Sequence, residues 1–172
     1  RARLADYLFA NMDSYDELVK LYELSERYYA EDMAVAGDPQ EKEAIEHLDW
    51  AGMRRARREN YLYLLDAIRD IPGLTPIFPK LPEDATPLGL PVYVTGMARD
   101  ELWNRLGKAG IGLTIHWQGI PNDTRLNCNT AAMEMAGRML TLACDQRTSR
   151  TQMDAMVECI QRILGEAKTG QS

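Results

Sequence analysis

The sequence is poor in the residues that build most metal and thiol sites. It contains two histidines and three cysteines among 172 residues. Cys128, Cys144 and Cys159 are odd in number and follow no metal-ligand spacing, so neither a metal centre nor a disulfide framework is expected. We expect reduced thiols in a cytoplasmic protein, with Cys144 as a buried structural residue rather than an activated nucleophile.

Long apolar runs and an excess of positive charge are also missing. No stretch is long enough to span a bilayer, and no secretory signal pattern opens the chain. The net charge of −6 argues against a nucleic-acid or anionic-membrane partner. The one dense basic run, residues 54–58, is flanked by acidic residues and is interpreted as the solvated face of a helix rather than a phosphate-binding patch. With 45% hydrophobic residues, the chain can still bury a core.

Patterns that mark common catalytic and phosphate-binding sites are absent or weak. Gly107, Gly110 and Gly112 have the spacing of a helix end and a strand start, not of a phosphate loop. His47 lies in acidic, helical sequence, where an exposed surface role is favoured. His116 precedes Trp117 at the end of an apolar stretch. This pair either lines a ligand cleft, or Trp117 packs over the core edge while His116 caps a backbone carbonyl.

Helical and strand patterns alternate along the chain. Asp38 begins a long helix by capping, with small residues at 52 and 56 that suit close approach to another element. Ser149 and Gln152 have the spacing of a capping box. The predicted elements are a helical arm over 1–36, a helix over about 39–70, extended irregular chain over 74–90, a strand over 91–95, a helix over 99–108, a strand over 111–115, a helix over 130–138, a strand over 139–144 and a final helix from 149.

This order predicts an α/β (α+β) fold. We expect a two-layer small domain with a short, mainly antiparallel sheet packed against helices, preceded by a helical arm and a long helix. The predicted division places the arm in residues 1–43 and the small domain, including the long helix, in residues 44–172. The apolar stripe of residues 1–36 needs a partner, so we expect this segment to pack back on the domain or to self-associate.

Several stretches, taken in order over residues 44–166, carry a resemblance that no single motif would establish. These stretches are Arg-Arg-Glu-Asn-Tyr at 57–61, Leu64-Leu65, Pro-Gly-Leu at 72–74, the run at 87–94, Arg-Asp-Glu-Leu at 99–102, Leu-x-x-x-Gly-Ile at 106–111, His116-Trp117 and the run at 139–147. In these stretches the sequence resembles the DegT/StrS family of sugar aminotransferases, although Ala143 stands where the family usually has proline.

The resemblance implies a fold type I enzyme, in which a large α/β domain holds pyridoxal phosphate and a small C-terminal domain closes the cleft. Such enzymes move an amino group from glutamate or glutamine to a keto-sugar, usually attached to a nucleotide. The cofactor requires a lysine and an aspartate. No lysine of this chain stands in a context like that of the family's cofactor site, and the lysines are Lys20, Lys42, Lys80, Lys108 and Lys168.

We therefore expect an enzymatic parent protein and a chain that is inactive and holds no pyridoxal phosphate by itself. The chain begins at Arg1, within helical sequence, and residues 1–43 are expected to end the large domain. By position in the family, His116, Trp117 and Gln118 would approach the substrate. Arg147 would hold an anionic group, or else form a surface ion pair. No catalytic, cofactor-binding or metal-binding residue is assigned.

The expected partners are the large domain of the same polypeptide, a second subunit of a parent homodimer and a sugar substrate, with no nucleic acid or membrane. Two alternatives to this hypothesis stay open. In the first, the chain is a free-standing α/β module that binds a small ligand or a protein. In the second, the parent protein kept the fold and lost the lysine.

Overall fold

A computed structural model describes residues 24, 27, 38–116 and 129–169, and it divides the chain into two compact units, residues 1–48 and 49–172. Most of the predicted helical arm lies outside the described residues. The described helix of the first unit is α3 (Pro39–Glu46). Asp38 caps it as predicted, because its carboxylate accepts from the Gln40 amide at 2.8 Å. No residue of α3 is buried.

The long helix predicted over 39–70 is wrong in one respect, because it is interrupted at residues 47–49. A new helix, α4 (Trp50–Ala67), begins after Asp49, whose side chain accepts from the Gly52 amide at 2.8 Å. A side chain that binds the amide three residues on starts a helix rather than continuing one. A Cβ at Gly52 would lie 2.0 Å from this carboxylate, so the glycine accommodates the cap and not a neighbouring element.

The second unit contains one antiparallel sheet, of order β1-β2-β3, within its described residues. The strands are β1 (Leu74–Pro76), β2 (Gly89–Val94) and β3 (Met139–Ala143). Pro91 of the central strand pairs with Thr141, and its carbonyl accepts from Ile77 at 3.0 Å on the β1 side. Proline has no backbone N–H, and the N–H that Pro91 lacks would also have faced the β1 side. The strand β1 itself ends at Pro76.

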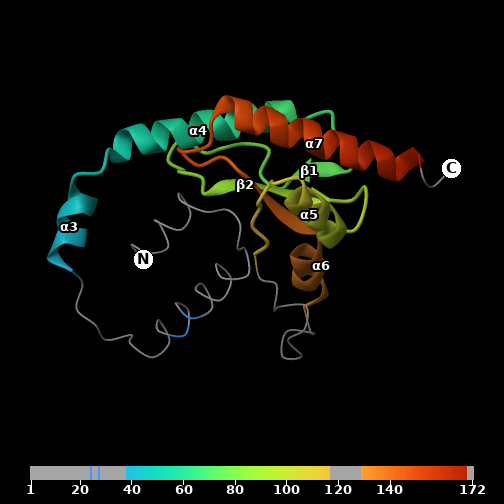
Figure 1. The fold of residues 1–172 in the computed structure, drawn as a ribbon, viewed down its shortest axis with the longest axis horizontal. Coiled ribbons are helices and arrows are strands. Elements are labelled where there is room, and N and C mark those ends of the chain that lie inside the picture. Colours follow the sequence, from blue (N-terminus) through green and yellow to red (C-terminus); the bar gives the residue numbers. More distant parts are fainter. Residues whose placement is uncertain (1–23, 25–26, 28–37, 117–128, 170–172) are drawn as a thin grey trace. The chain divides into compact units, whose positions relative to one another are not determined.

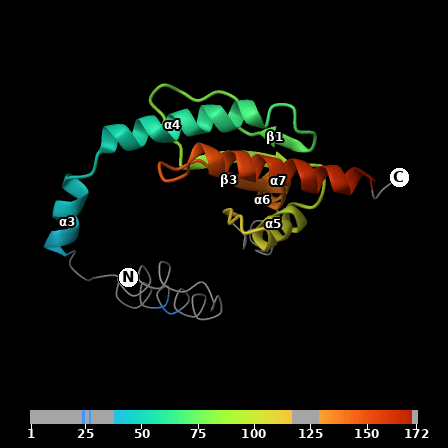
Figure 2. The ribbon, with the colours of Figure 1, turned by 45° about the horizontal axis from the view of Figure 1, so that its top comes forward.

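The two faces of the sheet are covered differently (Figures 1 and 2). One face packs against α4 and α7 (Arg150–Thr169), with α5 (Arg99–Lys108) contacting both α7 and β3. The other face lies towards α6 (Thr130–Arg138). The helix-covered face holds the core, which includes Tyr61, Leu64, Ile68, Leu90, Val92, Leu102, Leu106, Leu140, Leu142, Met153 and Ile160. The predicted two-layer fold is thus confirmed.

The strand predicted over 111–115 does not form; within it only Thr114 makes a bridge, to Thr141. Other partners take up the polar backbone groups of this segment. The Ile111 amide donates to the Leu106 carbonyl at 2.9 Å, and the Trp103 indole N–H donates to the Leu113 carbonyl at 2.7 Å. These two bonds tie the segment before Thr114 to α5.

Local signals predicted several elements well. The helices over 99–108 and 130–138 have the predicted bounds, and the third predicted strand is β3. The capping box is confirmed, because the Gln152 side chain accepts from the Ser149 amide at 2.8 Å and the Ser149 hydroxyl accepts from the Gln152 amide at 3.3 Å. The segment expected to be irregular over 74–90 contains β1 and the first residues of β2. No described helix combines the length and apolarity that a bilayer span requires.

Candidate functional site

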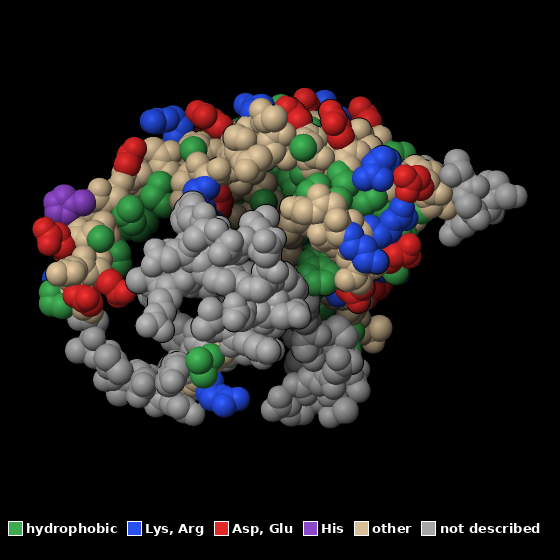
Figure 3. All heavy atoms as spheres, viewed as in Figure 1, with side chains coloured by type: hydrophobic (Ala, Val, Ile, Leu, Met, Phe, Trp, Pro, Cys, Tyr) green, Lys and Arg blue, Asp and Glu red, His purple; other side chains and the backbone are tan. Residues whose placement is uncertain are grey.

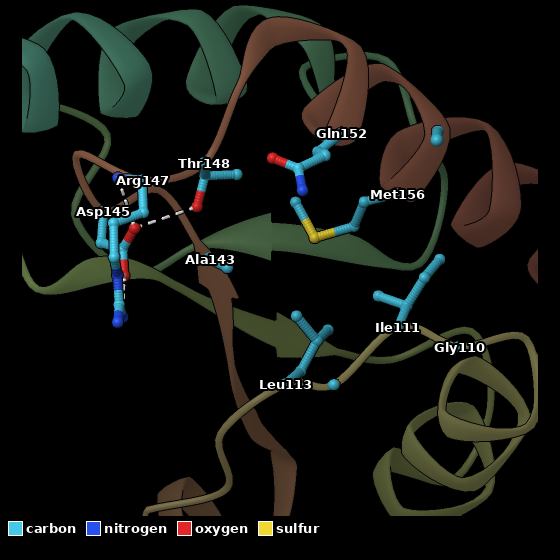
Figure 4. Close-up of a pocket in the computed structure, with 11 residues that line it drawn as sticks. Gly110, Ile111, Leu113, Ala143, Asp145, Arg147, Thr148, Gln152 and Met156 are labelled. Atoms are coloured by element: carbon cyan, nitrogen blue, oxygen red, sulfur yellow. Dashed lines mark hydrogen bonds and ion pairs between the residues drawn. The ribbon is translucent and has the colours of Figure 1, made fainter. Parts of the chain in front are cut away.

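A cavity of about 410 Å³ lies where β3 ends, beside the segment that follows α5 and the first turns of α7 (Figure 4). Its lining is mixed. The side chains of Ile111, Leu113 and Met156 form an apolar wall, and Ala143 lies at the end of β3. The opposite side is polar and consists of Asp145, Arg147, Thr148 and Gln152. Small-molecule sites combine apolar walls with a few fixed polar groups that orient the ligand.

Asp145 organises the polar side of this cavity. Its Oδ1 accepts from the Arg147 amide at 2.8 Å and from the Thr148 hydroxyl at 3.2 Å. Its Oδ2 accepts from Arg147 Nη2 at 2.5 Å and Nε at 3.0 Å. Hydrogen bonding from the Arg147 side chain, above all, holds the pKa of the Asp145 carboxyl below its ordinary value, against the opposing effect of burial. The cavity therefore presents a carboxylate and a guanidinium whose charges compensate each other.

Helix α4 fixes this turn from behind. The Asn60 side-chain amide donates to the carbonyls of Asp145 and Thr148, each at 3.0 Å. Arg57 Nε donates to the Gln146 side-chain oxygen at 2.7 Å. These partners are more than eighty residues apart in the sequence, so the polar side of the cavity is positioned by tertiary contacts rather than by its own turn alone.

Removing the Arg147 side chain should raise the pKa of Asp145 towards the ordinary aspartate value. A depressed carboxyl pKa stabilises the fold above the unfolded-state pKa, and this stabilisation is lost as pH falls through the folded-state pKa. Arg147→Ala should therefore weaken the pH dependence of stability below about pH 4. Carboxyl carbon NMR titration checks this. Arg162→Ala, which removes a pair with Glu166, should leave the Asp145 titration unchanged.

The predicted site residues are not brought together into one cavity. Arg147 lines the cavity of Figure 4, whereas His116 lines a separate hollow. Trp117 and Gln118 lie outside the described residues. The ion pair of Arg147 with Asp145 is one of its two expected uses, and contact with an anionic group stays a prediction.

The basic run on α4 requires a correction. Its interpretation as a solvated face fits Arg54 and Arg55, which are exposed, but is wrong for Arg57 and Arg58, which are half-buried. Arg58 Nη1 donates to the carbonyls of Pro82 and Ala85, both at 2.6 Å, and Arg54 Nη2 donates to the Glu83 carbonyl at 2.7 Å. Through these bonds, Arg54 and Arg58 hold the loop between β1 and β2.

The remaining candidate groups show no site chemistry. Burial raises the pKa of the Cys144 thiol to about 11, so this fully buried cysteine stays protonated near neutral pH, as a structural residue would. His47 is exposed, with its Nδ1 2.7 Å from the Glu43 carbonyl oxygen. Within the described ranges, no cluster of histidine, cysteine and carboxylate side chains could hold a metal ion.

Comparison with known proteins gives matches in structure but not in sequence. No protein-family model matches the chain, and no curated protein matches it. A solved structure of the aminotransferase TlmJ from Streptoalloteichus hindustanus matches with a TM-score of 0.58 and 19% identity, over 66% of this chain and 32% of that one. A DegT DnrJ EryC1 StrS aminotransferase from Brucella abortus matches with a TM-score of 0.51 and 19% identity, over 66% and 31%.

The chain shares its fold with sugar aminotransferases of the DegT/DnrJ/EryC1/StrS type. This confirms the fold relation that the ordered stretches of sequence indicated. The same fold occurs in the E. coli GDP-4-keto-6-deoxy-D-mannose-3-dehydratase with bound hydrated pyridoxal phosphate, with a TM-score of 0.54 and 20% identity, over 64% of this chain and 31% of that one. The chain thus spans about one third of the length of these structures.

The structure adds candidate site residues that the sequence did not single out, because they line the cavity or hold it in place. Thr148 and Gln152 line it together with Arg147, and Gln152 was recognised only as a helix cap. Asn60 lies in the Arg-Arg-Glu-Asn-Tyr stretch of the resemblance, but no local pattern indicates its bonds to a turn 85 and 88 residues away. The available signal was that Asn60 is a polar residue beside apolar neighbours in a helix.

Proposed function

We propose that this chain is the C-terminal small domain of a cytoplasmic, pyridoxal-phosphate-dependent enzyme that transfers an amino group from glutamate or glutamine to a nucleotide-linked keto-sugar. In this proposal the domain closes the active-site cleft of a larger, homodimeric parent and has no activity alone. The observation that carries it is the fold shared with sugar aminotransferases over two thirds of this chain.

The described residues do not fit a site for pyridoxal phosphate. Covalent attachment of this cofactor requires a lysine that faces a cavity. Lys42 is exposed and lies 3.8 Å from Glu46, and Lys80 and Lys108 are also exposed. None of these three lysines lines a described cavity. No step of the transfer reaction is therefore assigned to this chain, and the proposed role is to contact the substrate.

The polar side of the Figure 4 cavity supports contact with a sugar. Asp145 offers carboxylate acceptors, and Arg147 and Thr148 offer donors, so the set can bind hydroxyl groups in both senses. Because the charges of Asp145 and Arg147 compensate each other, the cavity has no net positive charge to favour a free anion. The uncharged ring of a sugar suits this lining better than a bare phosphate does.

Adding pyridoxal phosphate to the purified chain should give no absorbance band of a specific protein adduct. Borohydride reduction followed by peptide mapping should find no stoichiometric modification at a unique lysine. The described lysines are exposed to solvent, so the cofactor has no reason to react with one of them in preference to the others. A single stoichiometric adduct would instead place a cofactor site in this chain and contradict the proposed non-catalytic role.

A free-standing binding module is the second candidate, favoured by the same lack of a fitting lysine among Lys42, Lys80 and Lys108. The coding sequence beyond the codons for residues 1–172 separates the two. A continuous frame that encodes a large domain with a cofactor lysine supports the small-domain proposal. A large domain without that lysine indicates a parent that lost catalysis, and the absence of such a domain supports the module.

A further inference from the structure

A second hollow, of about 360 Å³, lies on the face of the sheet that is turned away from the helical core. Pro91 of β2 and Met139 of β3 form its floor. Both belong to the register positions that alternate with the core residues Leu90, Val92 and Leu140, and so point to the opposite face. Phe78 and Leu88 of the β1–β2 loop, Met135 of α6 and His116 complete the lining.

The lining exposes an unusual amount of apolar surface. Leu88 is 69% exposed, Phe78 60% and Met135 38%. Single exposed apolar side chains are common, but large ones gathered around one hollow mark a surface that another molecule or domain covers. Among the residues that the structure describes, no Asp, Glu, Lys or Arg lines this hollow, in contrast to the cavity of Figure 4. The lining therefore favours an apolar protein surface over a sugar or a phosphate.

The loop that carries Phe78 and Leu88 is held in place from α4. The Tyr61 hydroxyl donates to the Phe78 carbonyl at 2.7 Å. Arg58 donates to two further carbonyls of the loop, at Pro82 and Ala85, both at 2.6 Å. A loop with its backbone fixed loses little conformational entropy when a partner binds, which favours docking onto its side chains. The exposed apolar side chains are thus presented on a preorganised edge.

We propose that this apolar groove, lined by Phe78, Leu88, Pro91, His116, Met135 and Met139, is where the large domain of the parent polypeptide packs onto the small domain. The inference rests on the proposed function. It commits to the large domain because this chain covers only 31–32% of the solved structures that share its fold, so each of them is about three times as long as the part that matches. A domain in the same polypeptide also has a far higher effective concentration at the groove than a separate molecule.

Photo-crosslinking in the polypeptide encoded by the complete reading frame tests the groove. Leu88→p-benzoylphenylalanine places a photoreactive group at a position whose side chain is 69% exposed, so the substitution should not disturb the core. Irradiation and peptide mapping should give an intramolecular crosslink to a residue of the large domain. Leu62, 50% exposed on α4, is the matched control site and should give at least tenfold less of that crosslink.

Other crosslink positions would overturn the proposal. A crosslink between two copies of the polypeptide would make the groove a subunit interface. A crosslink within residues 1–172, or none above the Leu62 control, would show that the large domain does not cover it. If the polypeptide binds pyridoxal phosphate in any of these cases, the proposed function stands and the docking proposal alone fails. A reading frame without a large domain removes both.

Discussion

Replacing Gly73 by alanine is expected to lower the free energy of unfolding by about 2–5 kcal/mol, the sum of a left-handed backbone penalty and overpacking. Gly73 has φ +94°, a conformation that residues with a Cβ rarely adopt. A Cβ there would also lie 2.7 Å from the Gly96 Cα and 2.9 Å from its nitrogen. Both neighbours are backbone atoms, and the Gly73 carbonyl accepts from Thr95 at 2.9 Å, so the two segments cannot separate without cost.

Gly110 provides a matched control for Gly73. Its φ is +82°, but a Cβ at Gly110 would have no neighbour within 4 Å. Gly110→Ala should therefore show only the backbone penalty, about 1–2 kcal/mol. Urea denaturation followed by circular dichroism measures both variants on one scale. Equal losses at the two positions would mean that the close approach of Gly73 and Gly96 does not contribute.

Replacing Arg99 by methionine should destabilise the domain by about 2–3 kcal/mol, the range for losing a buried hydrogen bond from a charged donor. The Arg99 side chain is 6% exposed, and its Nη1 donates to the Met139 carbonyl at 2.9 Å. This bond joins the first residue of α5 to the first residue of β3, across forty residues of sequence. Methionine keeps much of the apolar contact but leaves the carbonyl without this donor.

Arg69→Met is the control for this effect. Arg69 pairs with Asp66 at 2.6 Å, but both side chains are about 70% exposed, so the loss should stay below about 0.5 kcal/mol. Thermal and urea unfolding of both variants, together with hydrogen exchange of the β3 amides, checks the difference. Protection of β3 that is unchanged in Arg99→Met would show that the arginine does not anchor the strand.

The sequence predicted those features that short-range spacing determines. The helices over 99–108 and 130–138 and the Ser149–Gln152 capping box follow from patterns within one or two turns, and all are present. The break before α4 was missed although Asp49 and Gly52 have cap spacing, because Ile45 and Leu48 have the apolar spacing of a helix that continues past residue 49. The strand predicted over 111–115 did not form: Thr114 alone bridges to β3, and bonds to Trp103 and Leu106 tie the segment to α5.

The candidate site was less predictable, for a physical reason. Arg147 was identified by position in a family pattern, and it does line a cavity. The residues that hold its turn, Arg57 and Asn60, act across more than eighty positions, and a single sequence contains no signal for such pairs. His116 follows an apolar stretch as expected, but it lines the apolar groove and not the cavity that Arg147 lines.

Helix α4 holds its neighbouring segments largely through side chains that bind backbone carbonyls: Arg54, Arg58 and Tyr61 for one loop, and Asn60 for the turn after β3. Every amino acid supplies a carbonyl, so the residues at 82, 83, 85 and 148 can change during evolution without removing these acceptors. The positions of both segments are encoded in the helix instead. Related chains can therefore diverge widely in their loops while the same architecture is inherited.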